Sequence, residues 1–234
     1  MSEKVVNITI ANRLATAHDK IAIAAENSGR KKSDVKLMAV SKTKSIQEIR
    51  TAYQLGQKIF GENYAQELAE KKGQLADLTD IEWHYIGPIQ SNKTAMICDS
   101  ADWVDSLDRL KIAKRLNAHA MANNKTLNVL IQVNISNSVT KSGVSIKEVD
   151  DFAKNLTQFS ALKLRGLMAI PDEGLEQKQL IFEFKQMQAC YSGLQDQYDS
   201  IDTLSLGMSD DLTEAILAGS NLVRLGTAIF GARS

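Results

Sequence analysis

The feature of this sequence that most constrains its fold is a regular alternation of short apolar runs with longer amphipathic segments, from about residue 35 onward. The apolar runs predict strands at Val35–Ser41, Lys58–Gly61, Glu82–Ile86, Asp102–Val104, Leu127–Asn134, Leu162–Ala169, Thr203–Leu206 and Leu222–Leu225. Strands that alternate with helices imply right-handed crossovers and a parallel sheet. Runs such as "LNVLIQVNI" and "LKLRGLMAI" are apolar almost throughout, which is typical of parallel strands covered on both faces.

The segments between these strands carry the three- and four-residue spacing of amphipathic helices. Helices are predicted at Ile46–Leu55, Tyr64–Leu75, Ser91–Asp99, Leu107–Ala122, Ile146–Gln158, Leu175–Tyr191 and Asp211–Ala218, after a leading helix over residues 3–29 that Gly29 ends. Eight strand–helix repeats favour a single (β/α)8 TIM-type barrel, and an open doubly wound sheet is the alternative. The leading helix is expected to close the outer ring of helices.

Composition limits the domain organisation and the class of partner. The 28 Lys and Arg residues balance the 28 Asp and Glu residues, so no global field favours nucleic acid or an acidic membrane. There is no signal-peptide or membrane-spanning run, and no Pro/Gly/Ser-rich linker. We therefore predict one domain over residues 1–234, with a leading helix over 1–30 and a barrel over 35–231. The two cysteines and three histidines are dispersed, which favours a reduced, cytoplasmic protein without a metal site.

In such a barrel, functional groups collect where strands end. The predicted carboxyl ends carry one amine, several amides and hydroxyls, and glycines that let a ligand approach the backbone. They are Lys42, Asn63, Ile86-Gly87, Ser106, Asn134, Ile170-Pro171, Gly207–Ser209 and Gly226-Thr227.

The last two of these ends predict a phosphate site. The stretches "SLGMSDD" and "VRLGTAIFG" supply loops after the seventh and eighth strands, where barrels often bind phosphate through backbone N–H groups. Ser209 and Thr227 add hydroxyl donors. In the alternative interpretation Ser209 and Asp211 only cap a helix, with Asp211 and Glu214 forming a capping box.

A lysine completes this pattern. In a closed barrel the eighth strand pairs with the first, so Lys42 at the end of "KLMAV" lies beside the phosphate loops. The arrangement suits a phosphorylated aldehyde whose carbonyl carbon condenses with the Lys42 amine. Lys44 lies past the strand and is expected to be solvated.

Arg224 stands inside the apolar strand "LVRLG" and needs a partner, because a lone buried charge is costly. The partner is either a carboxylate across the barrel or a phosphate or ring nitrogen of the ligand. Arginine does not release its proton in proteins, so a pyridine nitrogen facing it would stay unprotonated.

Six stretches taken together, "AVSKTK", "FGENYAQE", "WHYIGPIQSNK", "LRGLMAIP", "LSLGMSDD" and "VRLGTAIFGAR", resemble the pyridoxal phosphate homeostasis protein family. That family is similar to the barrel domain of alanine racemase. The resemblance implies that Lys42 forms the internal aldimine with pyridoxal 5'-phosphate (PLP), with Asn63 near the cofactor. It also implies that His84 and Asn92 line the same mouth, that Ser209, Gly226 and Thr227 hold the phosphate, and that Arg224 faces the pyridine nitrogen. Because Trp83 and Tyr85 alternate with His84, a packing role for His84 stays open.

The resemblance further implies a PLP-binding protein that buffers the cofactor or delivers it to apo PLP-dependent enzymes. Racemase chemistry needs a second base from a C-terminal β-domain, and no counterpart follows "IFG". We therefore expect a monomer that binds PLP without turnover. The alternatives are a weak PLP-dependent racemase or decarboxylase acting on a small amino acid and, setting the resemblance aside, a lysine Schiff-base aldolase that uses a sugar phosphate.

Overall fold

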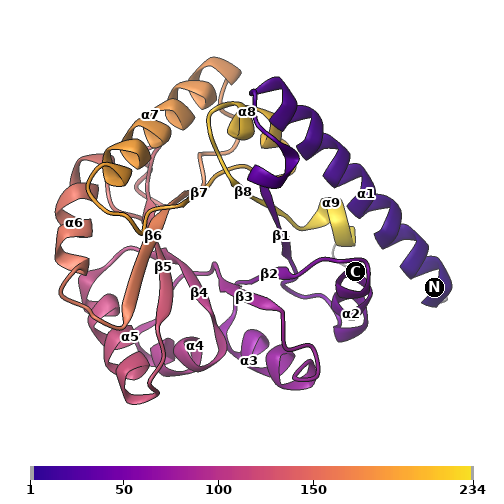
Figure 1. The fold of residues 1–234 in the computed structure, drawn as a ribbon, viewed down its shortest axis with the longest axis horizontal. Helices are drawn as coiled ribbons and strands as arrows, with labels where there is room; N and C mark the ends of the chain where they lie inside the picture. Colours follow the sequence, from indigo (N-terminus) through magenta and orange to yellow (C-terminus); the bar gives the residue numbers. More distant parts are fainter. Residues whose placement is uncertain (1–2, 233–234) are drawn as a thin grey trace.

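The computed structural model describes residues 3–232, with side chains from residue 9 onward, and in this part of the chain eight parallel strands close into one barrel (Figure 1). The strands are β1 (Lys36–Val40), β2 (Ile59–Glu62), β3 (Glu82–Tyr85), β4 (Trp103–Leu107), β5 (Leu127–Val133), β6 (Leu162–Ala169), β7 (Thr203–Ser205) and β8 (Leu222–Leu225). They follow one another in sequence order, and β8 pairs with β1. The predicted closed barrel is confirmed, and the first two and last two residues of the predicted domain lie outside the described part.

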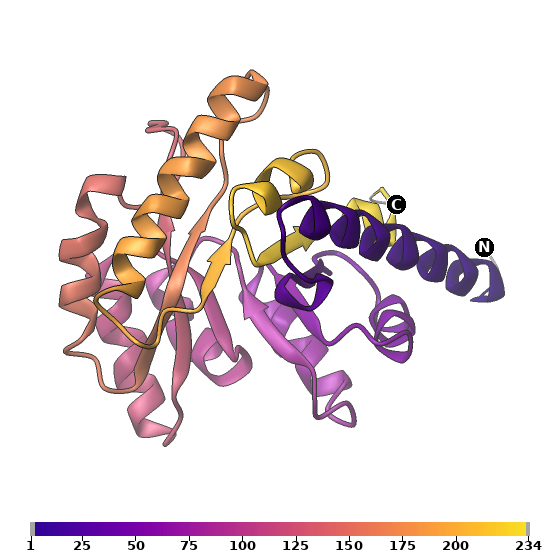
Figure 2. The ribbon, with the colours of Figure 1, turned by 45° about the horizontal axis from the view of Figure 1, so that its top comes forward.

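Helices surround this barrel on its outer face (Figures 1 and 2). They are α1 (Glu3–Asn27), α2 (Ile46–Gln54), α3 (Ala65–Gln74), α4 (Thr94–Ser100), α5 (Leu110–Ala122), α6 (Val149–Leu156), α7 (Gln177–Gln195), α8 (Leu212–Leu217) and α9 (Thr227–Phe230). The leading helix α1 packs against α2, α8 and α9, so it closes the ring between the first and the last repeats as predicted. None of the described helices is both long enough and apolar enough to cross a membrane.

Side-chain alternation along the strands decides which residues can reach the barrel interior. On β1, Leu37 and Ala39 pack into the core shared with the helices, whereas Met38 and Val40 alternate with them and face the barrel axis. Arg224 of β8 is in register with Met38 and faces the axis as well. Among the strand residues, only those that face the axis near the carboxyl ends can therefore contribute to a site at the mouth.

One boundary was predicted wrongly. The fourth strand was predicted over Asp102–Val104 and the next helix from Leu107, whereas β4 continues to Leu107 and α5 begins at Leu110. The added residues include Asp105 and Ser106, which are polar yet buried and hydrogen bonded. Hydrophobic periodicity misses such residues, because their burial depends on partners supplied by neighbouring strands.

Smaller differences concern the ends of helices. The helices predicted to begin at Ser91 and Ile146 open with 3-10 turns, Ser91–Lys93 and Ile146–Glu148. Helix α7 extends to Gln195, and the turn predicted at Gly226-Thr227 leads into the short helix α9. None of these differences moves a predicted strand end away from the mouth.

Candidate functional site

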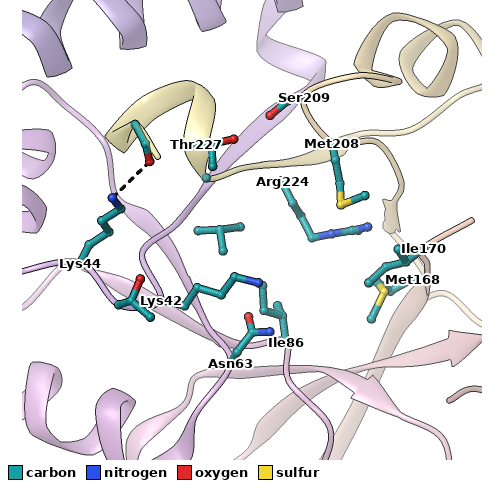
Figure 3. A pocket seen from close by; sticks show the side chains of 14 residues that line it. Lys42, Lys44, Asn63, Ile86, Met168, Ile170, Met208, Ser209, Arg224 and Thr227 are labelled. Carbon is teal, nitrogen blue, oxygen red and sulfur yellow. Dashed lines mark hydrogen bonds between the residues drawn. The ribbon is translucent and has the colours of Figure 1, made fainter. Parts of the chain in front are cut away.

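A cavity of about 270 Å³ opens at the carboxyl ends of the strands (Figure 3). It is lined by Val40, Lys42, Thr43, Lys44, Asn63, Ile86, Met168, Ile170, Met208, Ser209, Arg224, Gly226, Thr227 and Gly231. Of the residues implied to hold or line the cofactor site, the set includes Lys42, Asn63, Ser209, Arg224, Gly226 and Thr227, whereas His84 and Asn92 do not belong to it. The described lining includes three cationic side chains and no carboxylate, so the cavity favours an anionic ligand.

Lys42 enters this cavity from the end of β1. It lies two residues beyond the strand and is followed by Thr43, whose φ of 63° is a left-handed conformation that is rare for a β-branched residue. Figure 3 shows the Lys42 side chain extending into the cavity toward Asn63 and Ile86. Among the described residues its amine has no hydrogen-bond or ion-pair partner. The amine is therefore available to a ligand.

Lys44 is placed differently from the prediction of a solvated side chain. It is half-buried, and its Nζ donates hydrogen bonds to the carbonyl oxygen of Gly231 at 3.2 Å, which Figure 3 draws as a dashed line, and to that of Ala232 at 3.1 Å. These bonds tie the loop after β1 to the segment after α9. The two lysines of the motif thus have separate roles: Lys44 joins backbone segments, whereas Lys42 faces the ligand cavity.

Arg224 lies across the cavity from Lys42 and is only 4% exposed (Figure 3). Its Nη1 donates to the carbonyl and hydroxyl oxygens of Ser205 at 2.8 and 2.6 Å, and its Nη2 donates to the carbonyl oxygen of Ala169 at 2.9 Å. Burial lowers the pKa of Arg224, and the charge of Asp105 opposes that shift. Within the described chain no carboxylate forms a direct ion pair with this guanidinium, so the predicted carboxylate partner is present only as the more distant charges of Asp105 and Asp211.

The phosphate-binding residues predicted after the last two strands line one side of the cavity. Ser209 lies in the loop between β7 and α8, and Gly226 and Thr227 open α9 directly after β8. A Cβ on Gly226 would lie 3.4 Å from the carbonyl oxygen of Val40, which shows how closely the ends of β8 and β1 approach each other. This side of the cavity offers hydroxyl groups and the unpaired N–H groups of a helix start, the donors that phosphate prefers.

The alternative interpretation of this loop as a helix cap fails in its main point. The Asp211 carboxylate accepts a hydrogen bond from the backbone N–H of Met208 at 2.5 Å and makes no side-chain capping bond to α8. Glu214 accepts a hydrogen bond from Gln177 instead of the expected backbone N–H. The predicted capping box is therefore absent, and Asp211 shapes the loop that carries Ser209.

Asn63 contributes a polar atom that has no protein partner. Its Oδ1 is buried and, among the described residues, accepts no hydrogen bond. A buried unpaired carbonyl oxygen is costly, so this atom marks a place for a donor group of a ligand. Gly87 packs closely against the backbone of the same residue. A Cβ at position 87 would lie 2.0 Å from the backbone carbonyl oxygen of Asn63, so any larger residue there would displace Asn63.

His84 does not line the cavity at the mouth, so the implied placement there is wrong. It precedes Ile86, which does line the cavity, by two residues and therefore faces the barrel axis about 7 Å deeper. Its Nδ1 donates to Asp105 at 2.9 Å, its Nε2 donates to Glu82 at 3.2 Å, and its ring stacks on Trp103. We call Glu82, His84 and Asp105 the barrel cluster; it borders a different cavity, at the opposite end of the strands.

The barrel cluster keeps its histidine charged. Burial disfavours the imidazolium, but the charge of Asp105 and hydrogen bonds to Asp105 and Glu82 outweigh burial and raise the pKa of His84 to about 9. The same contact lowers the pKa of Glu82 against the effect of its own burial. The cluster is therefore an ionic part of the barrel core, which agrees with the packing role that the sequence left open.

Sequence reasoning missed parts of the site. The apolar wall is made by Val40, Ile86, Met168, Ile170 and Met208, of which Val40 and Met168 were not among the predicted strand ends. Next to the end of β1 lies an ionic group of Glu62 and Lys71, which are buried, and Glu67, which is half-buried. The i,i+4 spacing of Glu67 and Lys71 was its only sequence signal, and such pairs usually lie on solvated helix faces.

Comparison with known proteins agrees with this architecture. The model of the family described as alanine racemase, N-terminal domain, matches residues 15–234. The pyridoxal phosphate homeostasis protein of Escherichia coli K12 is 48% identical over 226 residues, which cover 96% of this chain and 97% of that protein. The protein of the same name from Pseudomonas aeruginosa PAO1 is 46% identical over 225 residues and covers 96% of each chain.

Solved structures show the same relationship. PipY of Synechococcus elongatus PCC7942 is 33% identical and matches with TM-scores of 0.85 without PLP and 0.81 with PLP bound, over 95% of this chain and 100% of PipY. An alanine racemase from Clostridium difficile 630 is 14% identical with a TM-score of 0.72, covers 96% of this chain and 56% of that one, and shows the fold alone. The chain has the barrel of the alanine racemase N-terminal domain. It belongs to the pyridoxal phosphate homeostasis protein family.

Proposed function

We propose that this protein binds PLP in the cavity at the barrel mouth and serves intracellular vitamin B6 homeostasis, buffering the cofactor or delivering it to apo PLP-dependent enzymes. One observation carries the proposal: the Lys42 amine, which has no partner among the described residues, faces the Arg224 guanidinium across a cavity whose described lining has no carboxylate. PLP combines an aldehyde with a phosphate, which suits this pairing. The PLP-bound structure of PipY supports it further.

The lining residues fit the parts of PLP. Lys42 would bond the aldehyde carbon, and Ser209, Gly226 and Thr227 would hold the phosphate. The buried Oδ1 of Asn63 would accept a hydrogen bond from a ring substituent. When bound, PLP supplies an aldehyde and a ring that can accept electrons.

Arg224 favours holding the cofactor over turnover. Its guanidinium would face the ring nitrogen and has no proton to give at neutral pH. The ring nitrogen would therefore stay unprotonated, and the ring as a whole would accept electrons poorly. A monomeric state and a cytoplasmic location are further predictions that accompany this function.

Borohydride reduction of the PLP-loaded protein followed by peptide mapping tests the site. We expect the reduced label on Lys42, in the wild type and equally in a Lys44→Ala variant, because the Lys44 amine is already bonded to backbone carbonyls. Lys42→Ala should abolish the label. A label on Lys44, or on no lysine, would contradict the proposal.

A transfer assay tests the carrier role against the alternative of a weak racemase. The loaded protein is mixed with an apo PLP-dependent enzyme, and recovered enzyme activity is followed together with the enantiomeric composition of added alanine. We expect PLP transfer with no racemisation. Racemisation that disappears in Lys42→Ala would instead establish an enzyme.

A further inference from the structure

A buried ionic group lies directly behind the residues that line the cavity. We call Glu62, Glu67 and Lys71 the mouth cluster. The side chain of Lys71 projects inward from α3, the residue is 5% exposed, and its Nζ lies 2.8 Å from the Oε1 atoms of both Glu62 and Glu67. Glu62 ends β2 and is fully buried.

The mouth cluster holds the main chain on both sides of Lys42. On one side, Ser41 donates its hydroxyl to Glu62 Oε1 at 2.6 Å, and its carbonyl oxygen accepts from Lys71 Nζ at 2.6 Å. On the other side, the backbone N–H of Thr43 donates to Glu67 Oε1 at 2.6 Å. Each residue that flanks Lys42 is therefore bonded to the cluster, whereas the Lys42 amine itself stays free for a ligand.

These bonds hold a conformation that the chain would not adopt by itself. Thr43 has a φ of 63°, and a β-branched residue keeps this left-handed conformation only where its surroundings enforce it. The turn also carries a bond from the Lys44 N–H to the Ser41 carbonyl oxygen at 2.9 Å. Without the bonds to the cluster, the backbone at the end of β1 would adopt another conformation, and the Lys42 side chain would no longer point into the cavity.

Stability alone does not account for such a group. Buried ion pairs contribute little net stability, because desolvation offsets their attraction, and apolar residues of similar volume often do as well. Here the cost is visible: Glu62 Oε2 is buried without a partner among the described residues, and burial raises the pKa of Glu62 above its usual value. The cluster does, however, fix the backbone conformation of the residues on either side of Lys42.

We infer that Glu62, Glu67 and Lys71 are positioning residues that fix the backbone around Lys42 so that its amine points into the ligand cavity. This inference rests on the proposed function for its ligand, PLP. It concerns residues that do not line the cavity and would not touch the ligand.

The chain offers a matched control in the next residue of the same helix. Lys72 also bonds a backbone carbonyl, donating to Ser100 at 3.0 Å, and lies 3.7 Å from Asp102, and among the described residues none of its bonds reaches the segment that carries Lys42. Lys71→Met and Lys72→Met each remove one ammonium group from α3. Only the first removes a bond to the segment that carries Lys42.

The experiment compares these variants in two measurements. The dissociation constant for PLP is obtained by absorbance titration at a temperature where each variant is folded, and amide hydrogen exchange of Thr43 and Lys44 is followed without PLP. For Lys71→Met we expect PLP affinity to fall by about tenfold or more and both amides to exchange at least about tenfold faster, because a charge-assisted bond is lost. For Lys72→Met we expect both quantities within about twofold of wild type.

Each outcome decides the inference. If folded Lys71→Met binds PLP as wild type does, or if Lys72→Met weakens binding equally, the cluster only docks α3 and the inference is wrong. If Lys71→Met does not fold, Ser41→Ala decides, with affinity expected to fall by about threefold and unchanged affinity overturning the inference. If the wild type takes up no PLP, the proposed function fails instead, and unchanged exchange at Thr43 in the variants would then overturn positioning.

Discussion

The mouth cluster and the barrel cluster are built alike but placed differently. Each places one buried cation between two carboxylates; the mouth cluster joins β2 to α3, and the barrel cluster joins β3 to β4. The structure separates them by what else their atoms bond: the mouth cluster holds the main chain beside Lys42, whereas the barrel cluster stacks on Trp103 and borders the cavity at the other end.

This difference teaches how buried charges should be read. A buried ion pair signals function only through the groups that it fixes, since its own contribution to stability is small. The barrel cluster fixes side chains within the core, so its loss should reduce stability. The mouth cluster fixes a backbone segment at the ligand cavity, so its loss should reduce binding.

The largest effect is expected where the barrel cluster is broken. Asp105→Asn removes the main counter-charge of His84 and should lower the free energy of unfolding by about 3–5 kcal/mol, as measured by urea denaturation. PLP affinity of the folded variant should stay within about threefold of wild type, because Asp105 does not line the mouth cavity. A large loss of PLP affinity in folded Asp105→Asn would show that the barrel cluster also affects binding, which would contradict the distinction between the two clusters.

A pH series tests the same cluster without mutation. The folded pKa of His84 is raised to about 9, whereas the unfolded value is about 6.5. The protonated histidine therefore stabilises the fold fully below about pH 6.5, and this contribution is lost as pH rises through about 9, a fall of about 3 kcal/mol in all.

The free energy of unfolding, measured in urea between these pH values, should fall with pH in the wild type. His84→Gln provides the control and should remove most of the slope. The slope that remains would belong to other groups, such as the two cysteine thiols, whose pKa values burial raises. Equal slopes in both proteins would show that His84 does not carry the charge.

The smallest effect on stability is expected at Thr43. Thr43→Gly relieves the left-handed strain but adds freedom to the unfolded chain, so the free energy of unfolding should change by less than about 1 kcal/mol. PLP affinity should still fall by about threefold, because a glycine there holds Lys42 less firmly. Titration and urea denaturation of the same preparation give both values. A gain in affinity would show that the strain at Thr43 opposes binding.

Much of the fold could be predicted because its signals are local. Apolar runs predict the strands, and their number predicts a closed barrel, in which β8 must pair with β1. That closure alone brings Lys42 and Thr227 to one mouth, although they stand far apart in the chain. The rule that sites form at strand ends then placed most of the candidate residues correctly at the cavity.

The sequence predictions failed where the environment of a side chain depends on its depth in the barrel or on a partner that is distant in the sequence. His84 stands near the end of β3 but one layer below the residue that reaches the cavity, and the motif does not show that depth. Lys44 was expected in solvent, yet carbonyl groups of Gly231 and Ala232 bind it. No prediction singled out Lys71, because its spacing from Glu67 is typical of a solvated helix face; Glu62 at the end of β2 gives it a buried partner.

The sequence by itself determined the order of strands and helices, the closed barrel and the lysine at the end of its first strand, because hydrophobic periodicity and strand-end position are properties of neighbouring residues. Only the tertiary structure decided which charges are buried and what they bond. A charge is buried or solvated according to groups that barrel closure brings from elsewhere in the chain. Lys42, which faces the ligand cavity, and Lys71, which bonds the backbone beside it, are therefore distinguished by their partners and not by their sequence context.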